Sequence, residues 1–162
     1  MKLYLGTKLV KATPMTRGDY NAHRGWHLPS NENGADAGYL VEYTDGGQRN
    51  HEAHQGYVSW SPKDVFERAY RETDGGLTFG CAIAAMRAGL KVARTGWNGK
   101  GMFIYYVPPG RYQPTTTAAR EFFCGGPVPY REYIAMKTVD DEVVPWLASQ
   151  SDILSEDWRI VE

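Results

Sequence analysis

Hydrophobic residues alternate with polar residues over several short stretches of the chain, which is the period of a half-buried strand. Turn-forming residues bound these stretches; Asp45-Gly46-Gly47, for example, follows the stretch 39–44. On this basis strands are predicted at residues 2–12, 39–44, 102–107, 133–138, 143–146 and 158–161. The stretches 133–138 and 143–146 are predicted to form a hairpin that turns at Asp140 and Asp141.

Hydrophobic residues that recur three and four positions apart predict short helices, and each begins with a capping residue. The candidate N-caps are Thr16, Ser61, Thr78 and Ser149. The apolar stripe that follows Thr78 consists of Phe79, Ile83, Met86 and Leu90. Ser61 is followed by Pro62 at the first helical position. Ser149 forms a capping box with Asp152 in place of the usual Glu.

Two glycines after Thr73 and Asp74 mark the best candidate boundary, which divides the chain into residues 1–75 and 76–162. Five of the nine prolines fall within 108–130, so this part is predicted to be a long irregular loop inserted into the second domain. The predicted fold class is α+β, with a small, twisted, mostly antiparallel sheet and short helices in the second domain. The first domain is predicted to be a small α/β module.

The predicted strand 102–107 is apolar on both faces. A strand of this kind lies at the centre of a sheet or is covered by another subunit. In so small a domain, a partner subunit is the expected source of that cover, so we expect a homo-oligomer, either a dimer or a tetramer.

Charge is unevenly distributed, although the net charge is only -1 and does not predict binding to long nucleic acid. Between Leu77 and Arg120 there is no acidic residue, and the cations are Arg87, Lys91, Arg94, Lys100, Arg111 and Arg120. Beyond Val139 the sign reverses, with seven acidic residues against Arg159 alone. The two blocks are expected either to pair with each other or to leave the cations for an anionic ligand, and both can hold at once.

Composition places the chain in a reducing cytoplasm. The two cysteines, Cys81 and Cys124, form neither a disulfide framework nor a metal motif. The N-terminal residues are too polar for a secretory signal, and no apolar run reaches membrane-spanning length. We therefore expect a cytoplasmic protein that has no membrane partner.

Sequence features of an enzyme are weak. HEAHQ, at residues 51–55, resembles the HExxH metalloprotease motif, but its second histidine comes one residue early. His23, His27, His51 and His54 are therefore predicted to be solvated loop residues that hold no metal. No phosphate-binding glycine loop or nucleophile motif is present in the sequence. We predict a protein without catalytic residues or a cofactor.

A ligand-binding function has better support. Trp97 lies among cations, and an indole can stack on a nucleotide base. Asn98 offers a donor and an acceptor, and Gly99 permits close approach of the backbone. Asp152, at a helix start, is suited to accept from a ribose hydroxyl, and Trp146 can supply a second ring. On the residues alone, however, the favoured interpretation is that Trp97 packs in the core and that the glycines beside it only form a turn.

Two long motifs then carry a resemblance, ARTGWNGKGMF at 93–103 and VPWLASQSDILSEDW at 144–158. Residues 77–162 resemble a family of small phage and prophage proteins that includes the second type of Thoeris anti-defence protein. The resemblance implies a molecular sponge in the host cytoplasm. Such a sponge sequesters a cyclic ADP-ribose isomer made by TIR-domain immune enzymes, or in some members a cyclic dinucleotide, without cleaving it. It further implies a homotetramer with pockets at subunit interfaces.

The resemblance also assigns roles to residues of this chain. It implies that Trp97 and Asn98 contact base or ribose, and that Ser149 and Asp152 contribute polar groups. The remaining implied ligand-binding residues are Phe79, Arg94, Thr95, Gly99, Trp146 and Gln150. Residues 1–75 resemble a separate, uncharacterised phage module. Two alternatives stay open: a phage structural or interaction module with no small ligand, and a hydrolase of the same signal.

Overall fold

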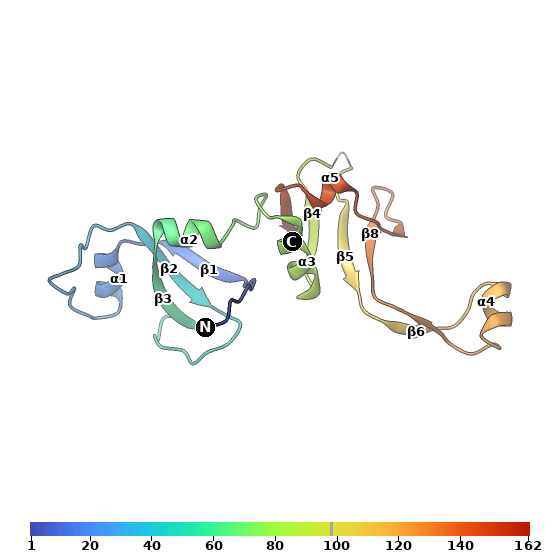
Figure 1. Ribbon diagram of the computed structural model, residues 1–162, viewed down its shortest axis with the longest axis horizontal. Coiled ribbons are helices and arrows are strands. Elements are labelled where there is room, and N and C mark those ends of the chain that lie inside the picture. The colour runs from blue at the N-terminus through green and yellow to red at the C-terminus, as the bar shows by residue number, and fades with distance from the viewer. Residues whose placement is uncertain (98) are drawn as a thin grey trace. The chain divides into compact units, whose positions relative to one another are not determined.

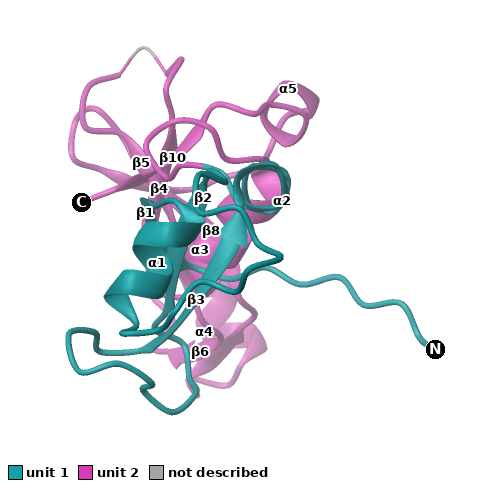
Figure 2. Ribbon diagram, turned by 90° about the vertical axis from the view of Figure 1, so that its left-hand side faces the viewer, with its two compact units in different colours: residues 1–71 teal, residues 72–162 magenta. Residues whose placement is uncertain are grey.

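The computed structural model describes residues 1–97 and 99–162 and divides into two compact units, residues 1–71 and 72–162 (Figure 2). Each unit combines short helices with antiparallel strands, which confirms the predicted α+β class. Among the described residues, no helix has both the length and the apolar composition that a membrane crossing requires.

The first unit is built on a three-stranded antiparallel sheet in the order β1-β2-β3 (Figure 1). Its strands are β1 (Val10–Pro14), β2 (Gly38–Tyr43) and β3 (Tyr57–Pro62). The predicted strand 2–12 is therefore wrong over its first eight residues, because pairing with β2 begins only at Val10. The small α/β module predicted here has strands that all pair antiparallel.

Two short helices pack on opposite faces of this sheet. On α1 (Arg17–His23), capped by Thr16 as predicted, Tyr20 packs with Leu40 and Val58. On α2 (Lys63–Ala69), the Phe66 ring stacks on Tyr39 with centroids 4.3 Å apart. Leu40 and Tyr39 are successive strand residues, so their side chains point to opposite faces. The predicted cap at Ser61 is wrong, because β3 runs to Pro62 and Pro62 itself precedes the helix without a side-chain cap.

The second unit contains a five-stranded antiparallel sheet in the order β10-β4-β5-β8-β9. Its strands are β4 (Lys91–Arg94), β5 (Phe103–Val107), β8 (Tyr133–Lys137), β9 (Val143–Pro145) and β10 (Trp158–Val161). The strand predicted to be apolar on both faces, β5, is the central one. The predicted β8–β9 hairpin is confirmed, and its turn places Asp141 at φ 63.

Helix α3 (Phe79–Arg87) covers one face of this sheet and forms the core with it. Thr78 caps the helix through the Cys81 N–H, as predicted. The buried core consists of Leu77, Ala82, Met86, Val92, Ile104 and Trp158. The chain leaves the helix at Gly89, which has φ +89, a conformation that glycine adopts without the cost of a Cβ.

Residues 108–130 are not the irregular loop that their prolines predict. They form a two-stranded ribbon of β6 (Gly110–Tyr112) and β7 (Val128–Tyr130), joined through helix α4 (Thr117–Phe122). Figure 1 shows this arm continuing from the ends of β5 and β8. Of the five prolines only Pro129 lies in a strand, and a two-stranded ribbon has free edges, where a missing N–H breaks no ladder bond.

Candidate functional site

Aromatic rings gather where the turn after β4 meets the start of β10. The Trp97 ring centroid lies 5.5 Å from that of Trp158 and 6.2 Å from that of Trp146, and both pairs meet edge to face. Trp158 is fully buried, whereas Trp97 and Trp146 are half-buried. The indole of Trp97 therefore packs against the core and still reaches the surface, and the ligand contact predicted for it stays a prediction.

Phe79, the first residue of α3, closes the aromatic cluster on the helix side. Its ring centroid lies 5.4 Å from that of Trp158 and 6.3 Å from that of Trp146. The first turn of α3 contains no acidic side chain. The cluster therefore lies beside a helix N-terminus, where the partial positive charge of the backbone favours an anionic group.

Arg94, the last residue of β4, joins the two predicted ligand segments. Its Nη1 donates to Asp152 Oδ1 at 2.9 Å, and its Nε donates to Asp157 Oδ1 at 2.8 Å. This contact confirms that the cationic block pairs in part with the acidic block near the C-terminus. The resemblance implies ligand pockets at subunit interfaces, and the structure connects these two segments within one chain.

Hydrogen bonds fix the charge of both carboxylates in this network. Hydrogen bonds from Arg94 and Ser155 lower the pKa of Asp157 from 3.8 to about 2. Burial alone would raise the pKa of Asp152, but hydrogen bonds from Ser149 and Arg94 outweigh it and lower that pKa. The same two aspartates raise the pKa of the Arg94 guanidinium. At neutral pH the network is therefore one cation held between two anions.

The capping box predicted at Ser149 is confirmed at the start of α5 (Gln150–Ile153). The Ser149 hydroxyl donates to Asp152 Oδ2 at 2.6 Å and accepts from the Asp152 N–H at 3.2 Å. The carbonyl of Asp152 also accepts from Trp158 Nε1 at 3.0 Å. These bonds tie the helix start to the aromatic cluster and to Arg94 at once.

The turn after β4 is held to the same network. Thr95 donates through both its N–H and its hydroxyl to the carbonyl of Asp157, at 3.0 and 3.1 Å. At Gly99 a Cβ would come within 2.0 Å of Met102 Sδ, so any larger residue there would require the Met102 side chain to move. Asn98 lies outside the described residues, and the role predicted for it stays a prediction.

The structure thus brings together Phe79, Arg94, Thr95, Trp97, Trp146, Ser149 and Asp152. Gln150 lies at the exposed start of α5, and Gly99 lies beside Met102 and Val139. Sequence reasoning missed Asp157 and Trp158, which complete the charge network and the aromatic cluster. Both lie at the end of the motif at 144–158, but nothing in their spacing distinguishes them from a surface acid and a core strand residue.

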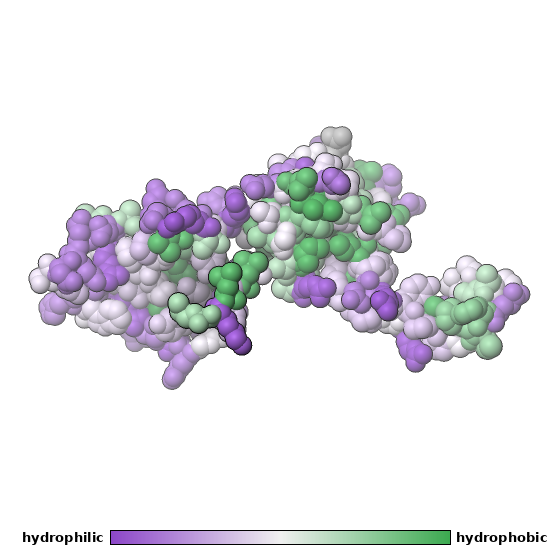
Figure 3. Space-filling model, in the orientation of Figure 1, coloured by the Kyte–Doolittle hydropathy of each residue, from purple (hydrophilic) through white to green (hydrophobic). Residues whose placement is uncertain are grey.

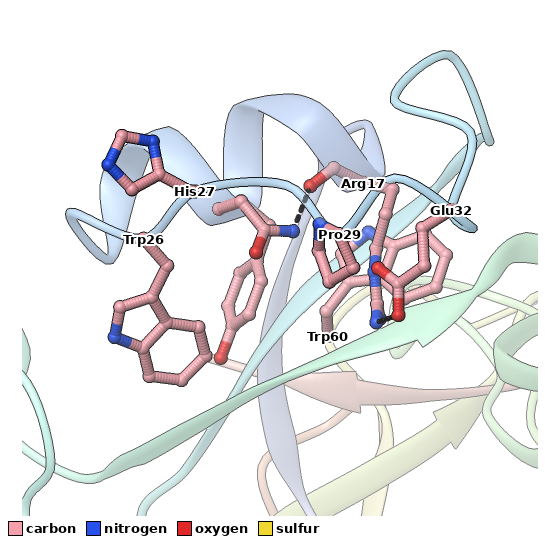
Figure 4. Close-up of a pocket in the computed structure, with 8 residues that line it drawn as sticks. Arg17, Trp26, His27, Pro29, Glu32 and Trp60 are labelled. Atoms are coloured by element: carbon pink, nitrogen blue, oxygen red, sulfur yellow. Dashed lines mark hydrogen bonds and ion pairs between the residues drawn. The ribbon is translucent and has the colours of Figure 1, made fainter.

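Two surface hollows lie elsewhere among the described residues. One, of about 370 Å³, is in the first unit, with Trp26 at one end and Trp60 beside the Arg17–Glu32 ion pair at the other (Figure 4). The second, of about 350 Å³, lies between the C-terminal end of α3 and β5, and its lining includes Met86, Leu90, Phe103 and Tyr105. No predicted ligand residue that the structure describes lines either hollow.

The prediction that the histidines are solvated is wrong for three of the four side chains. His23, His51 and His54 are half-buried and place one potential ligand atom each within 4.8 Å of one another. His27 alone is exposed, as predicted. The sequence hid this cluster because His23 ends α1, whereas the other two lie in the connection between β2 and β3.

The residues that form the aromatic cluster and the charge network fall within a part of the chain that matches one known protein family. Residues 77–161 match the model of the Tad2-like family, described as the Thoeris anti-defense 2-like domain. The chain is 34% identical over 85 residues to Thoeris anti-defense 2 of Bacillus phage SP01, a match that covers 52% of this chain and 94% of that protein. The chain therefore belongs to the Thoeris anti-defense 2-like family.

Proposed function

We propose that this protein sequesters a cyclic nucleotide immune signal without cleaving it, and so opposes Thoeris immunity in the cytoplasm of a phage-infected bacterium. The first candidate ligand is a cyclic ADP-ribose isomer, and the second is a cyclic dinucleotide. The observation that carries the proposal is the half-buried Trp97, set beside Trp146 and the start of α3 within the residues that match the family.

The chemistry of the cluster suits such a ligand. A base stacked on an aromatic side chain contributes about 1–3 kcal/mol. The first turn of α3 favours a phosphate through its backbone charge. Ser149 and Asp152 follow Trp146 closely in the sequence, and they supply acceptors for ribose hydroxyls or base amines. Arg94 already donates to two carboxylates, so its role is to position the two segments rather than to neutralise a phosphate.

The charge network supports binding without turnover. General acid–base catalysis works best with a group whose pKa lies near the working pH. The pKa of Asp157 is about 2, and that of Asp152 is also lowered, so both remain ionised at neutral pH. Their geometry suits both carboxylates better to hold Arg94 in place than to donate a proton.

Exposed apolar side chains near the cluster support a homo-oligomer. Leu147 is 92% exposed and Leu154 is 76% exposed, and they flank the segment that carries Ser149 and Asp152. Hydrophobic side chains also gather on the face of residues 72–162 shown in Figure 3. Exposed apolar patches of this kind mark interaction surfaces, and a second copy of the chain is the partner we infer.

A binding experiment with product analysis tests the proposal. The full chain is titrated with cyclic ADP-ribose isomers, cyclic dinucleotides and linear ADP-ribose, and thermal unfolding is recorded. A ligand at 100 times its dissociation constant adds about 2.7 kcal/mol to the free energy of unfolding. Trp97→Ala should abolish the shift, whereas Trp26→Ala, a matched indole in the first unit, should retain it.

The alternatives give different results in the same experiment. Denaturing the complex should release the cyclic nucleotide unchanged, and recovery of a linear product would instead identify a hydrolase. If no nucleotide shifts the unfolding temperature while Trp97→Ala still lowers it, the domain is an interaction module without a small ligand.

A further inference from the structure

Three histidines from two separate segments converge in the first unit, away from the residues that match the family. His23 is the last residue of α1, and His51 and His54 lie in the connection between β2 and β3. The Nε2 atoms of His23 and His54 are 2.9 Å apart, and the His23 and His51 rings stack with centroids 4.2 Å apart. Convergence of three partly buried imidazoles is typical of a metal site rather than of solvated loops.

The connection that carries two of these histidines is fixed at both ends. The Asn50 side chain makes a pair of bonds with the Val58 backbone, at 2.8 and 2.9 Å. The Glu42 carboxylate accepts from the N–H groups of Gln55 and Gly56 at 2.8 and 2.9 Å. Because both ends are held by β2 and β3, the histidines are presented on a braced loop.

The cluster also has the outer partner that metal-bound histidines usually have. Glu42 Oε2 lies 3.4 Å from His54 Nδ1, so a proton at Nδ1 is stabilised there and the Nε2 lone pair points into the cluster. His23 Nε2 then carries the hydrogen of the contact with His54, so metal binding at this nitrogen requires the other neutral tautomer of His23, with its proton on Nδ1.

His51 is the ligand that must rearrange. Its Nε2 lies 3.0 Å from the His23 carbonyl, and its Nδ1 accepts from the Ala53 N–H at 3.2 Å. One of these two bonds is given up when the ring turns to a metal. The contact is local, because His51 and Ala53 are two residues apart and the loop remains held by Asn50 and Glu42.

We propose that His23, His51 and His54 form a binding site for one divalent transition-metal ion of the zinc type, with water at the fourth position. In a tetrahedral site with Zn–N bonds of about 2.0–2.1 Å, ligand nitrogens lie about 3.4 Å apart. The three ligand atoms, all within 4.8 Å of one another, need only small movements to reach this spacing. Mg²⁺ and Ca²⁺ are disfavoured, because they prefer oxygen ligands.

A metal bound at this site would link the end of α1 to the β2–β3 connection. The first unit has a small core of Tyr20, Leu40 and Val58, with Met15 and Trp60 at its edge. Units of this size often depend on a metal or a disulfide for stability. The metal is therefore inferred to be a structural clip of the first unit, independent of the ligand proposed for the second.

The test uses the full chain, purified without a polyhistidine tag and stripped with a chelator. Zn²⁺ is titrated by calorimetry, and Co²⁺ is added as a spectroscopic probe of coordination number. We expect one equivalent of tight binding, a four-coordinate Co²⁺ spectrum and a higher unfolding temperature. His23→Ala and His54→Ala should weaken binding by more than about a hundredfold, since loss of an outer partner alone costs about 10- to 100-fold.

His27→Ala is the matched control, because His27 is exposed and outside the cluster. Its metal affinity should equal that of the wild type. The proposal is overturned if the wild type binds no stoichiometric metal, or if His27→Ala weakens binding as much as His54→Ala. Should the cluster variants fail to fold, the Co²⁺ spectrum of the wild type decides: a four-coordinate spectrum at one equivalent supports the site, and its absence rejects it.

Discussion

Replacing Asp157 by Asn removes one of the two anions that hold Arg94, and the effect on stability can be worked out from the structure. Asp157 accepts from Arg94, from Ser155 and from the Gly96 N–H, and these bonds lower its pKa from 3.8 to about 2. A difference of about 1.8 pKa units corresponds to about 2.4 kcal/mol. The side chain is 34% exposed, so water screens the interaction and we expect a loss of about 1–2 kcal/mol at pH 7.

The pH dependence gives this prediction a sign. The pKa of Asp157 is lower in the folded state than in the unfolded state, so between about pH 2 and 4 the unfolded chain binds more protons. The stabilisation is therefore complete above about pH 4 and is lost as the pH falls to about 2. The difference between wild type and Asp157→Asn should shrink over this interval and vanish at its lower end.

Native-state hydrogen exchange followed by mass spectrometry is the suitable assay, because it reports on β4 and β10 apart from the first unit. Asp64→Asn is the matched control, since Asp64 pairs with Arg68 on the surface with 76% of its side chain exposed. That variant should change stability by less than about 0.5 kcal/mol. Equal protection of β4 in wild type and Asp157→Asn at pH 7, or a difference that persists at pH 2, would refute the reasoning.

Two further variants, each with a control, test the packing of the first unit and the self-association inferred for the second. Gly56→Ala would place a Cβ 2.0 Å from the Tyr43 carbonyl oxygen, so thermal unfolding should show a loss of about 1–3 kcal/mol or more, whereas Gly6→Ala, with open space around it, should be neutral. Leu154→Glu should reduce the oligomer to smaller species in sedimentation without unfolding the chain; Val65→Glu, an exposed apolar position in the first unit, should leave the assembly unchanged.

The sequence predicted the local elements well where the signal is itself local. The caps at Thr16, Thr78 and Ser149 depend on residues three positions apart, and all three are confirmed. The arm at 108–130 escaped prediction because its proline content outweighed a weak strand signal. Its strands β6 and β7 are three residues each and stabilise one another only once they are paired.

The candidate site was predicted in its parts but not in its connections. Indoles and capping residues can be recognised from their neighbours in the chain, whereas the Arg94–Asp157 contact spans 63 residues and depends on β4 pairing with β10. The histidine cluster was not predicted for the same reason, since His23 and His54 are 31 residues apart. Sequence spacing cannot reveal a site whose members are brought together by a sheet and its loops.

The charge network also constrains where the wall of the proposed ligand pocket must come from. Arg94 is committed to two carboxylates, and the two surface hollows do not include the aromatic cluster. Trp97 and Trp146 are half-buried, so one chain presents a stacking surface, and we infer that a second copy supplies the wall over it. Leu147 and Leu154 leave their side chains exposed on either side of the Ser149 helix start. If a second copy covers them, it also closes the space over Trp97, so a variant that breaks the oligomer should lose the nucleotide while each chain keeps its fold.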